Sequence, residues 1–269
     1  MNPPPATPAT YEQTRRKTFL VVLVAALGYF VDIYDLILFA IVRVESLIDI
    51  GVAQDDLLSP GVLLLNMQMG GMLVGGILWG VLGDRRGRLS VLFGSIAMYS
   101  IANIANGFVN SVEAYAAWRF VAGVGLAGEL GAGVTLVSEV MSKEARGYGA
   151  MIISAVGILG AVVGALVGDF FTWRTAYFVG GGMGVALLIL RIGVAESGMF
   201  EQVRQQTVSR GDFFMLFRTA ERRMRYLAVI LIGVPIWYVV GILVTFAPEF
   251  GRALGMDELP VAGQAIMFC

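Results

Sequence analysis

The sequence predicts an all-α protein that spans a membrane, and three of its features lead to that prediction. The chain of 269 residues is 57% hydrophobic and 14% charged, whereas a soluble domain is about 45–50% apolar and about 25% charged. Apolar runs of about twenty residues, the length that crosses a bilayer as a helix, recur along the chain. Glycine contributes 35 residues, and small residues are enriched where membrane helices pack closely. A water-soluble globule is therefore disfavoured.

The residue counts also disfavour several functions. With 19 basic and 20 acidic residues, the chain has no basic excess for binding a nucleic-acid backbone. It contains no histidine, which removes His-dependent metal sites and Ser–His chemistry. The single cysteine, Cys269, cannot form an internal disulfide. Because the sequence shows no cluster of nucleophile, base or metal ligands, we expect neither an enzyme nor a bound metal or cofactor.

The order of apolar and charged segments predicts four regions. Residues 1–17 form a cytoplasmic tail, since four of the eight prolines fall within the first eleven residues. Residues 18–193 form a six-helix transmembrane bundle, 194–225 a charged cytoplasmic loop, and 226–269 the start of a second bundle. The helices are expected at 18–42, 58–83, 89–109, 113–140, 147–168, 173–193 and 226–248, and an eighth apolar segment opens near Leu259. Because that segment stops at Cys269, we expect the chain to be truncated.

The positions of the basic residues predict that the N-terminus is cytoplasmic. With that orientation, fifteen of the nineteen lie in interior segments, including the seven arginines from Arg191 to Arg225. The exterior loops hold Arg43, Arg174 and Arg252. Cytoplasmic loops carry such an excess, and the first apolar run is too long for a cleaved signal peptide. We therefore expect a multi-pass protein of the plasma membrane, specifically of a bacterial inner membrane, with the lipid bilayer as its surroundings.

A nine-residue motif joins the second and third predicted helices, and it runs Gly80-Val81-Leu82-Gly83-Asp84-Arg85-Arg86-Gly87-Arg88. It resembles the signature loop of the major facilitator superfamily, G-x-L-x-D-R-x-G-R, although Leu89 replaces a further basic residue. Gly80 lets a neighbouring helix approach, Gly87 permits a tight turn, and Asp84 can accept hydrogen bonds at the membrane edge. A purely topogenic loop would explain the arginines but not these three residues.

Two further segments resemble elements of sugar-porter-like members of that superfamily. The run from Glu139 to Gly147 is similar to E-x(6)-R-G, and Glu196-Ser197 is similar to P-E-S, with Ala195 in place of proline. The resemblance implies a cytoplasmic gating network made of Gly80, Asp84, Arg85, Gly87, Arg88, Glu139, Arg146 and Glu196. It also implies the six-helix N-terminal bundle of a transporter, followed by helix 7 and part of helix 8, with the C-terminal half missing.

Charged residues inside the predicted helices are the candidates for the transport site. Asp32 and Asp35 lie in the first helix, and Arg119 and Glu129 lie in the fourth. A charge at the bilayer centre costs at least about 2.5–3.5 kcal/mol, so these residues should be paired or face water. At 1.5 Å per residue, Asp35 lies about 10 Å and Arg119 about 9 Å from the outer surface. We therefore expect Asp35 or Asp32 to face Arg119.

That pairing would suit proton coupling. A carboxylate beside an arginine keeps its negative charge, whereas a carboxylate that loses the arginine in a dry site binds a proton more readily. The resemblance implies the same role, since acids of helix 1 and an arginine of helix 4 recur in proton-linked sugar porters. A static ion pair, or an arginine that binds an anionic substrate, are the alternatives. Glu129 could be a second proton site or a network member.

The substrate cavity is predicted to include Asn66, Gln68, Trp237 and Tyr238, for each of which simple interhelical packing is an equal alternative. The function predicted from these residues and the resemblance is proton-coupled symport of a small sugar or organic acid by alternating access. An uncoupled facilitator of the same fold, or a truncated remnant that does not transport, are the alternatives.

Overall fold

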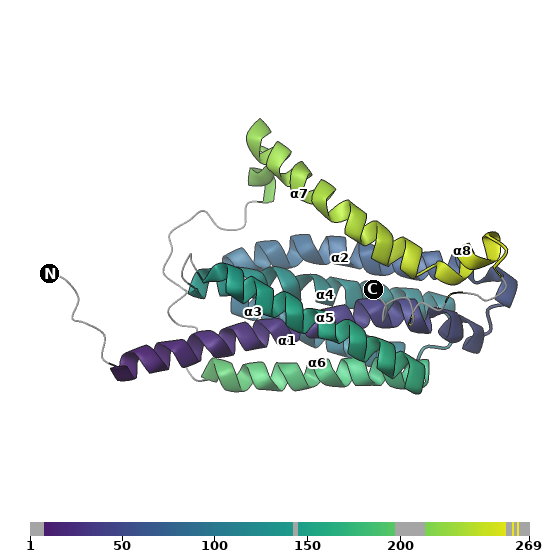
Figure 1. The fold of residues 1–269 in the computed structure, drawn as a ribbon, viewed down its shortest axis with the longest axis horizontal. Helices are drawn as coiled ribbons and strands as arrows, with labels where there is room; N and C mark the ends of the chain where they lie inside the picture. The colour runs from purple at the N-terminus through teal and green to yellow at the C-terminus, as the bar shows by residue number, and fades with distance from the viewer. Residues whose placement is uncertain (1–7, 142–144, 197–212, 257–259, 261–262, 264–269) are drawn as a thin grey trace.

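The structure, a computed structural model, describes residues 8–141, 145–196, 213–256, 260 and 263. In this part of the chain every regular element is a helix, and α1 to α6 lie side by side in one bundle (Figure 1). The bundle consists of α1 (Pro8–Asp49), α2 (Leu58–Arg86), α3 (Arg88–Asn106), α4 (Val112–Val140), α5 (Arg146–Phe170) and α6 (Trp173–Glu196). The short 3₁₀ helix η1 (Gln54–Asp56) precedes α2. The predicted all-α fold is confirmed.

Successive helices run in opposite directions, so the bundle has two distinct ends. The α1–α2 and α5–α6 connections lie at one end, which we call the α1–α2 end, and the α2–α3 connection lies at the other, the α2–α3 end (Figure 1). The predicted orientation makes the α2–α3 end cytoplasmic. Five helical segments of the described part are long and apolar enough to cross a membrane: Phe19–Asp49, Leu58–Arg86, Arg146–Phe170, Trp173–Ile192 and Ala220–Val244.

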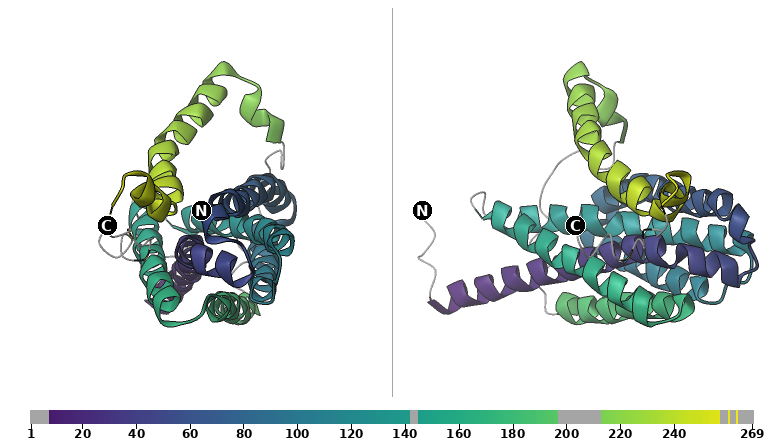
Figure 2. Two further views of the ribbon diagram at one scale, coloured as in Figure 1. Left: turned by 90° about the vertical axis from the view of Figure 1, so that its right-hand side faces the viewer. Right: turned by 45° about the vertical axis from the view of Figure 1, so that its right-hand side comes forward.

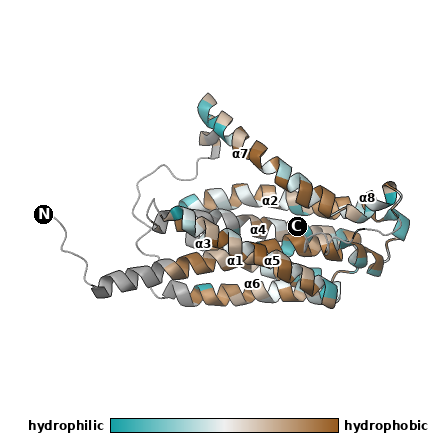
Figure 3. Ribbon diagram, viewed as in Figure 1, coloured by the Kyte–Doolittle hydropathy of each residue, from teal (hydrophilic) through white to brown (hydrophobic). Residues whose placement is uncertain are grey.

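Apolar side chains cover much of the outside of the bundle, as a bilayer requires. Figure 3 shows hydrophobic residues along α2, α5 and α6, and Leu73, Ile158 and Ile189 are each more than 60% exposed. In water these side chains would favour association, whereas in lipid they satisfy the hydrophobic requirement of a spanning helix.

The first helix is longer than predicted at both ends. It begins at Pro8, inside the predicted tail 1–17, and ends at Asp49 rather than near residue 42. The prediction ended the helix before Arg43 because a charge interrupts the apolar run. In the structure Arg43 is fully buried inside α1 and has an acidic partner. Assigning it to an exterior loop was therefore wrong.

The segment after residue 212 also differs from the prediction. A 3₁₀ helix, η3 (Phe213–Phe217), is followed by α7 (Ala220–Tyr238), which begins within the predicted loop because the Thr219 side chain accepts a hydrogen bond from the Arg222 amide. The predicted helix 226–248 then continues as the π-helix η4 (Val239–Val244) and a separate α8 (Ala247–Ala253). Most of the apolar segment predicted from Leu259 lies outside the described residues.

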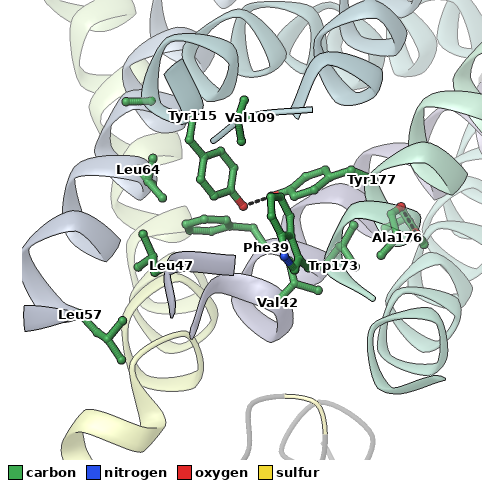
Figure 4. Packing of buried hydrophobic residues seen from close by; sticks show 13 residues of the cluster. Phe39, Val42, Leu47, Leu57, Leu64, Val109, Tyr115, Trp173, Ala176 and Tyr177 are labelled. Atoms are coloured by element: carbon green, nitrogen blue, oxygen red, sulfur yellow. Dashed lines mark hydrogen bonds between the residues drawn. The ribbon is translucent and has the colours of Figure 1, made fainter. Parts of the chain in front are cut away.

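A cluster of aromatic side chains forms the core near the α1–α2 end (Figure 4). The rings of Tyr115 and Trp173 stack with centroids 6.0 Å apart, and Tyr177 meets Tyr115 edge-on at 5.9 Å. The Tyr34 hydroxyl donates to the carbonyl of Ala176 at 2.8 Å, which attaches α1 to α6. Buried aromatic pairs of this kind add about 0.5–1.5 kcal/mol to the energy of simple burial. This core fixes the helices that carry the charged residues.

Glycines bring two pairs of helices into backbone contact. A Cβ at Gly71 in α2 would collide with the carbonyl oxygen of Phe120 in α4, and one at Gly160 in α5 would collide with that of Phe30 in α1. Gly76, one position beyond the contact face of α2, has open space around it. The small-residue stripe of α2 is therefore a packing surface on one side only, and the close approach of α2 to α4 places Gln68 beside Arg119.

The second-half helices contact the bundle at the α1–α2 end. Figures 1 and 2 show α7 leaning away from the bundle at its first residues and approaching α2 at its last. No described residue of α7 is buried, whereas Thr245, Phe246 and Gly251, in and beside α8, are buried. The contact between the two parts is therefore concentrated around α8.

Candidate functional site

A buried polar network joins α1, α2 and α4 in the middle of the bundle. The Oδ2 atom of Asp35 accepts a hydrogen bond from Nε2 of Gln68 at 2.8 Å and lies 3.4 Å from Nη1 of Arg119. Nη2 of Arg119 donates to Oε1 of Gln68. Asp35 and Arg119 have no exposed surface and Gln68 has 1%. The structure thus places together three of the residues predicted for the cavity.

The Arg119 guanidinium is held by aromatic groups as well as by polar ones. Its carbon lies 4.3 Å from the centroid of the Phe39 ring, a cation–π geometry. Its Nη1 lies 3.4 Å from the Tyr177 hydroxyl, which pairs with the Tyr115 hydroxyl at 2.6 Å (Figure 4). The Tyr115 hydroxyl lies 3.4 Å from Oγ of Ser46. Polar atoms therefore continue from Arg119 towards the α1–α2 end.

Two atoms of this network are buried without a hydrogen-bond partner in the described part of the chain: Nε of Arg119 and Oδ1 of Asp35. An unsatisfied buried atom of a charged group carries a desolvation cost of at least about 1–3 kcal/mol. Buried ion pairs are weak contributors to stability, and ionisable groups inside a membrane are kept mainly for function. The arrangement therefore identifies this network as the candidate functional site.

A second buried ion pair lies closer to the α2–α3 end. Nη2 and Nη1 of Arg191 in α6 contact the two carboxylate oxygens of Glu129 in α4 at 2.5 and 2.9 Å. Ser95 donates to Glu129 at 2.6 Å, and Arg191 also donates to the carbonyl of Leu92 at 2.7 Å. This bidentate pair is the strongest geometry that an arginine and a carboxylate can adopt.

Arg191 lies within α6, as the predicted helix 173–193 had it, and is 2% exposed. The sequence analysis counted it only among the basic residues of the cytoplasmic side and missed that it pairs with Glu129. Helical register could have paired the two residues. Glu129 is seventeen residues after the start of α4 and Arg191 eighteen residues after the start of α6, and both helices start at the same end of the bundle. An intramembrane acid at that depth requires a cation at the same depth.

Asp32 lies between the two ion pairs. Gly28, Asp32 and Asp35 are spaced by four and three residues and therefore share one face of α1. A Cβ at Gly28 would lie 2.6 Å from Nη2 of Arg191, so this face runs from the second ion pair to the first. Asp32 is 4% exposed, and its Oδ1 has no hydrogen-bond partner in the described part. It interacts electrostatically with Asp35 and with the Glu129 pair.

The other predicted cavity residues are not part of this network. Asn66 is exposed on α2, and Trp237 and Tyr238 of α7 are 46% and 54% exposed. Their assignment to a substrate cavity stays a prediction.

The predicted gating network is only partly described. Gly87 forms the turn between α2 and α3 with φ of +95°, a conformation that favours glycine. Gly80 was expected to let a neighbouring helix approach, but in the described part of the chain it has open space around it. Asp84 is half-buried and Arg85 is exposed. Arg146 begins α5, and its Nε donates to the carbonyl of Met141 at 3.3 Å. The side chains of three further members lie outside the described part: Arg88, Glu139 and Glu196. The network stays a prediction.

A helical bundle with an apolar exterior and opposed charges buried in its middle has the features of a polytopic membrane protein with a functional site inside the membrane. The sequence profile described as Major Facilitator Superfamily matches residues 18–269. The chain therefore belongs to the Major Facilitator Superfamily. Because this family and the curated relatives are transporters, the prediction that the chain is not an enzyme is confirmed.

The names of the curated relatives mention several different solutes. The chain is 35% identical to the niacin transporter NiaP of Acinetobacter baylyi over 131 residues, which cover 47% of this chain and 30% of that protein. It is 29% identical to the 3-(3-hydroxy-phenyl)propionate transporter of Escherichia coli over 151 residues, 52% of this chain and 38% of that protein. The matched residues cover less than half the length of each of these relatives.

Solved structures show the same fold. The structure aligns with the D-xylose-proton symporter with a TM-score of 0.63 and 19% identity, covering 93% of this chain and 64% of that one. An inward-open structure of the xylose transporter XylE from Escherichia coli gives a TM-score of 0.61 with 18% identity, covering 81% of this chain and 59% of that one. At this identity the likeness shows the fold alone.

Proposed function

We propose that the protein is a proton-coupled symporter of small organic acids that works by alternating access, with its N-terminus in the cytoplasm of a bacterium. The observation that carries the proposal is the buried network of Asp35, Gln68 and Arg119. It combines a carboxylate that can take up a proton, an arginine that can bind an anion, and an amide that contacts both.

An organic acid fits the network better than a neutral sugar. Arg119 keeps an unpartnered Nε, and its Nη1 contact with Asp35 is long at 3.4 Å. The ion pair between Arg119 and Asp35 is therefore weak enough for the guanidinium to exchange one carboxylate for another, and an arginine fork matches a carboxylate in two-point contact. The Phe39 and Tyr177 rings beside it suit an apolar or aromatic body. Niacin and an aromatic propionate appear in the names of relatives.

The same exchange would couple the substrate to a proton. When a substrate carboxylate takes the guanidinium of Arg119, Asp35 loses its counter-charge in a site without solvent. A carboxyl group in that situation is more stable with a proton bound. The proton and the anion thus enter together, and both leave when Arg119 returns to Asp35. No histidine is required.

Asp32 would connect Asp35 to the other side of the membrane. It lies one helical turn closer to the α2–α3 end, which the proposed orientation makes cytoplasmic, and the Glu129–Arg191 pair is the next charged group in that direction. We assign to the motif residues at this end, Asp84 to Arg88, the role of holding the inner side closed in the opposite conformation. An orientation with this end outside the cell would contradict both assignments, and a protease site placed there would be cut from outside.

Uptake into vesicles that contain the full-length protein tests the proposal. We expect nicotinate or 3-phenylpropionate to accumulate when the outer solution is more acidic than the lumen, with the membrane potential clamped, and D-xylose not to do so. Equal uptake with and without the pH gradient would identify an uncoupled facilitator, and no uptake of nicotinate or 3-phenylpropionate would reject the proposed substrate class.

Replacement of Asp35 by Asn isolates the proton step. The Asp35→Asn variant keeps a side chain of the same shape, so we expect substrate counterflow to persist while accumulation driven by the pH gradient is lost. Glu45→Gln is the matched control, because Glu45 is an exposed acid on the same helix. Unchanged accumulation by Asp35→Asn would move the proton role to Asp32.

A further inference from the structure

Arg43 joins the first helix of the bundle to the second half of the chain. Its Nη2 contacts the two carboxylate oxygens of Glu249 in α8 at 2.7 and 2.9 Å and donates to the carbonyl of Thr245 at 3.1 Å. Its guanidinium carbon lies 4.5 Å from the centroid of the Phe246 ring. Three residues of one short segment, 245–249, therefore surround one arginine from a helix that is more than 200 residues away in the sequence.

The bundle holds a space for this side chain. Gly61 of α2 faces it, and a Cβ at that position would lie 2.6 Å from Nη1 of Arg43. Arg43 has no exposed surface, and its Nε and Nη1 have no hydrogen-bond partner in the described part of the chain. The positive charge of this desolvated guanidinium is therefore compensated mainly by the Glu249 carboxylate.

The pair is also built so that it can separate. The Glu249 side chain is 16% exposed, so water can reach the carboxylate as α8 moves away. The contact lies at the α1–α2 end, where α8 meets the bundle, whereas α7 has no buried residue along its length (Figures 1 and 2). Buried contact with the bundle is thus made at this end by α8 and the residues just before it, whereas α7 leans away from the bundle and η3, before it, lies against α2.

We propose that Arg43 and Glu249 form the gate that closes the outer entrance between the two halves of the transporter, and that this pair breaks each time the protein opens outward. This inference rests on the proposed function for the direction of opening. The contact itself is independent of the identity of the solute and of proton coupling.

Thiol cross-linking of the full-length protein tests the gate. Arg43→Cys and Glu249→Cys are combined in a Cys269→Ser background, with a protease site inserted between α6 and η3. A short bifunctional thiosulfonate reagent should keep the two protease fragments together on a gel. We expect this cross-link to abolish uptake and a reducing agent to restore it, because the outer entrance cannot open while the halves are joined.

The exposed ion pair between Asp49 and Arg174 provides the matched control. It lies at the same end, with Oδ2 and Nη2 3.2 Å apart, but both residues belong to the first bundle. Cross-linking an Asp49→Cys/Arg174→Cys variant should leave uptake intact, since a link within one rigid body does not oppose its rotation. Loss of uptake in this control as well would overturn the interpretation of the gate cross-link.

A second variant tests the gate without a cross-link. Glu249→Gln keeps the shape of the side chain and removes its charge, so the outward-open state should gain population. We expect an impermeant thiol reagent added outside to label an Asn66→Cys reporter about tenfold faster, as a shift of about 1.4 kcal/mol in a two-state equilibrium produces. An unchanged labelling rate would overturn the gate.

These readouts separate the gate from the proposed function. If the Arg43→Cys/Glu249→Cys cross-link blocks external labelling but the protein carries no organic acid, the gate stands and the proposed substrate class fails. If the protein accumulates organic acids and the cross-link changes neither uptake nor labelling, the gate fails and the proposed function stands.

Discussion

Removal of Arg191 should reveal how strongly the second ion pair holds the bundle together. The Arg191→Met variant leaves Glu129 buried with only the Ser95 hydroxyl as a described partner, and it also removes the donor to the Leu92 carbonyl. Breaking one side of a buried pair costs about 3–5 kcal/mol, because the remaining charge is uncompensated. Arg225→Met is the control, since Arg225 forms an ion pair whose partners are 79% and 73% exposed, and such pairs contribute little.

The double variant Glu129→Met/Arg191→Met distinguishes loss of a contact from exposure of a bare charge. Replacing both partners of a buried pair with apolar residues is often neutral or stabilising, so we expect the double variant to recover most of the loss. Equilibrium unfolding by increasing mole fractions of sodium dodecyl sulfate in mixed micelles, followed by circular dichroism, gives the free energies. A single variant as stable as the parent, or a double variant worse than Arg191→Met, would refute the reasoning.

Three further substitutions can be measured by the same unfolding titration. Gly71→Ala should destabilise the bundle because its Cβ collides with a backbone carbonyl of α4, whereas Gly76→Ala, with open space, should be neutral or gain up to about 1 kcal/mol from helix propensity; equal effects would contradict this. Gly28→Ala should displace the Arg191 guanidinium, 2.6 Å from the new Cβ, and its cost should shrink in the Arg191→Met background; additive effects would argue against that contact. Asp49→Asn should lower the free energy of unfolding by less than about 1 kcal/mol, because the paired side chains of Arg174 and Asp49 are 31% and 51% exposed. A loss of more than about twice that value would contradict the assignment of this pair to the surface.

The membrane fold was predictable because it depends on local properties of the chain. The number of apolar residues in each run decides whether a segment crosses a bilayer, and this can be counted without knowing the neighbours. The level of Asp35 and Arg119 was also predictable, since both depths are measured along helices from the same surface. The amide bridge from Gln68 was not predictable, because it depends on the backbone approach of α2 to α4.

At Arg43 a charge was taken to mark the end of a helix, and at Arg191 a charge inside a predicted helix was left without a partner. Both arginines are buried within helices because an acidic side chain from another helix compensates them. Glu249 is 206 residues from Arg43, and Glu129 is 62 residues from Arg191. Patterns within a window of twenty residues do not contain such partners.

The start of α7 was misplaced for a related reason. Its first turns carry Arg222, Arg223 and Arg225, which made this segment look like a loop. They form a regular helix that begins at the Thr219 cap, outside the apolar part. A polar helix end extending beyond the bilayer core cannot be recognised from hydropathy alone.

The continuity of α1 has a thermodynamic consequence. Arg43 and Asp35 lie on the same unbroken helix, eight residues and therefore about 12 Å apart along its axis. A displacement of that helix changes the surroundings of both, so the two equilibria are linked, and linkage is reciprocal. Under the proposed proton step and the proposed gate, acidifying the medium should change how readily the second half detaches, by the same factor with which detachment changes the affinity of the bundle for hydrogen ions.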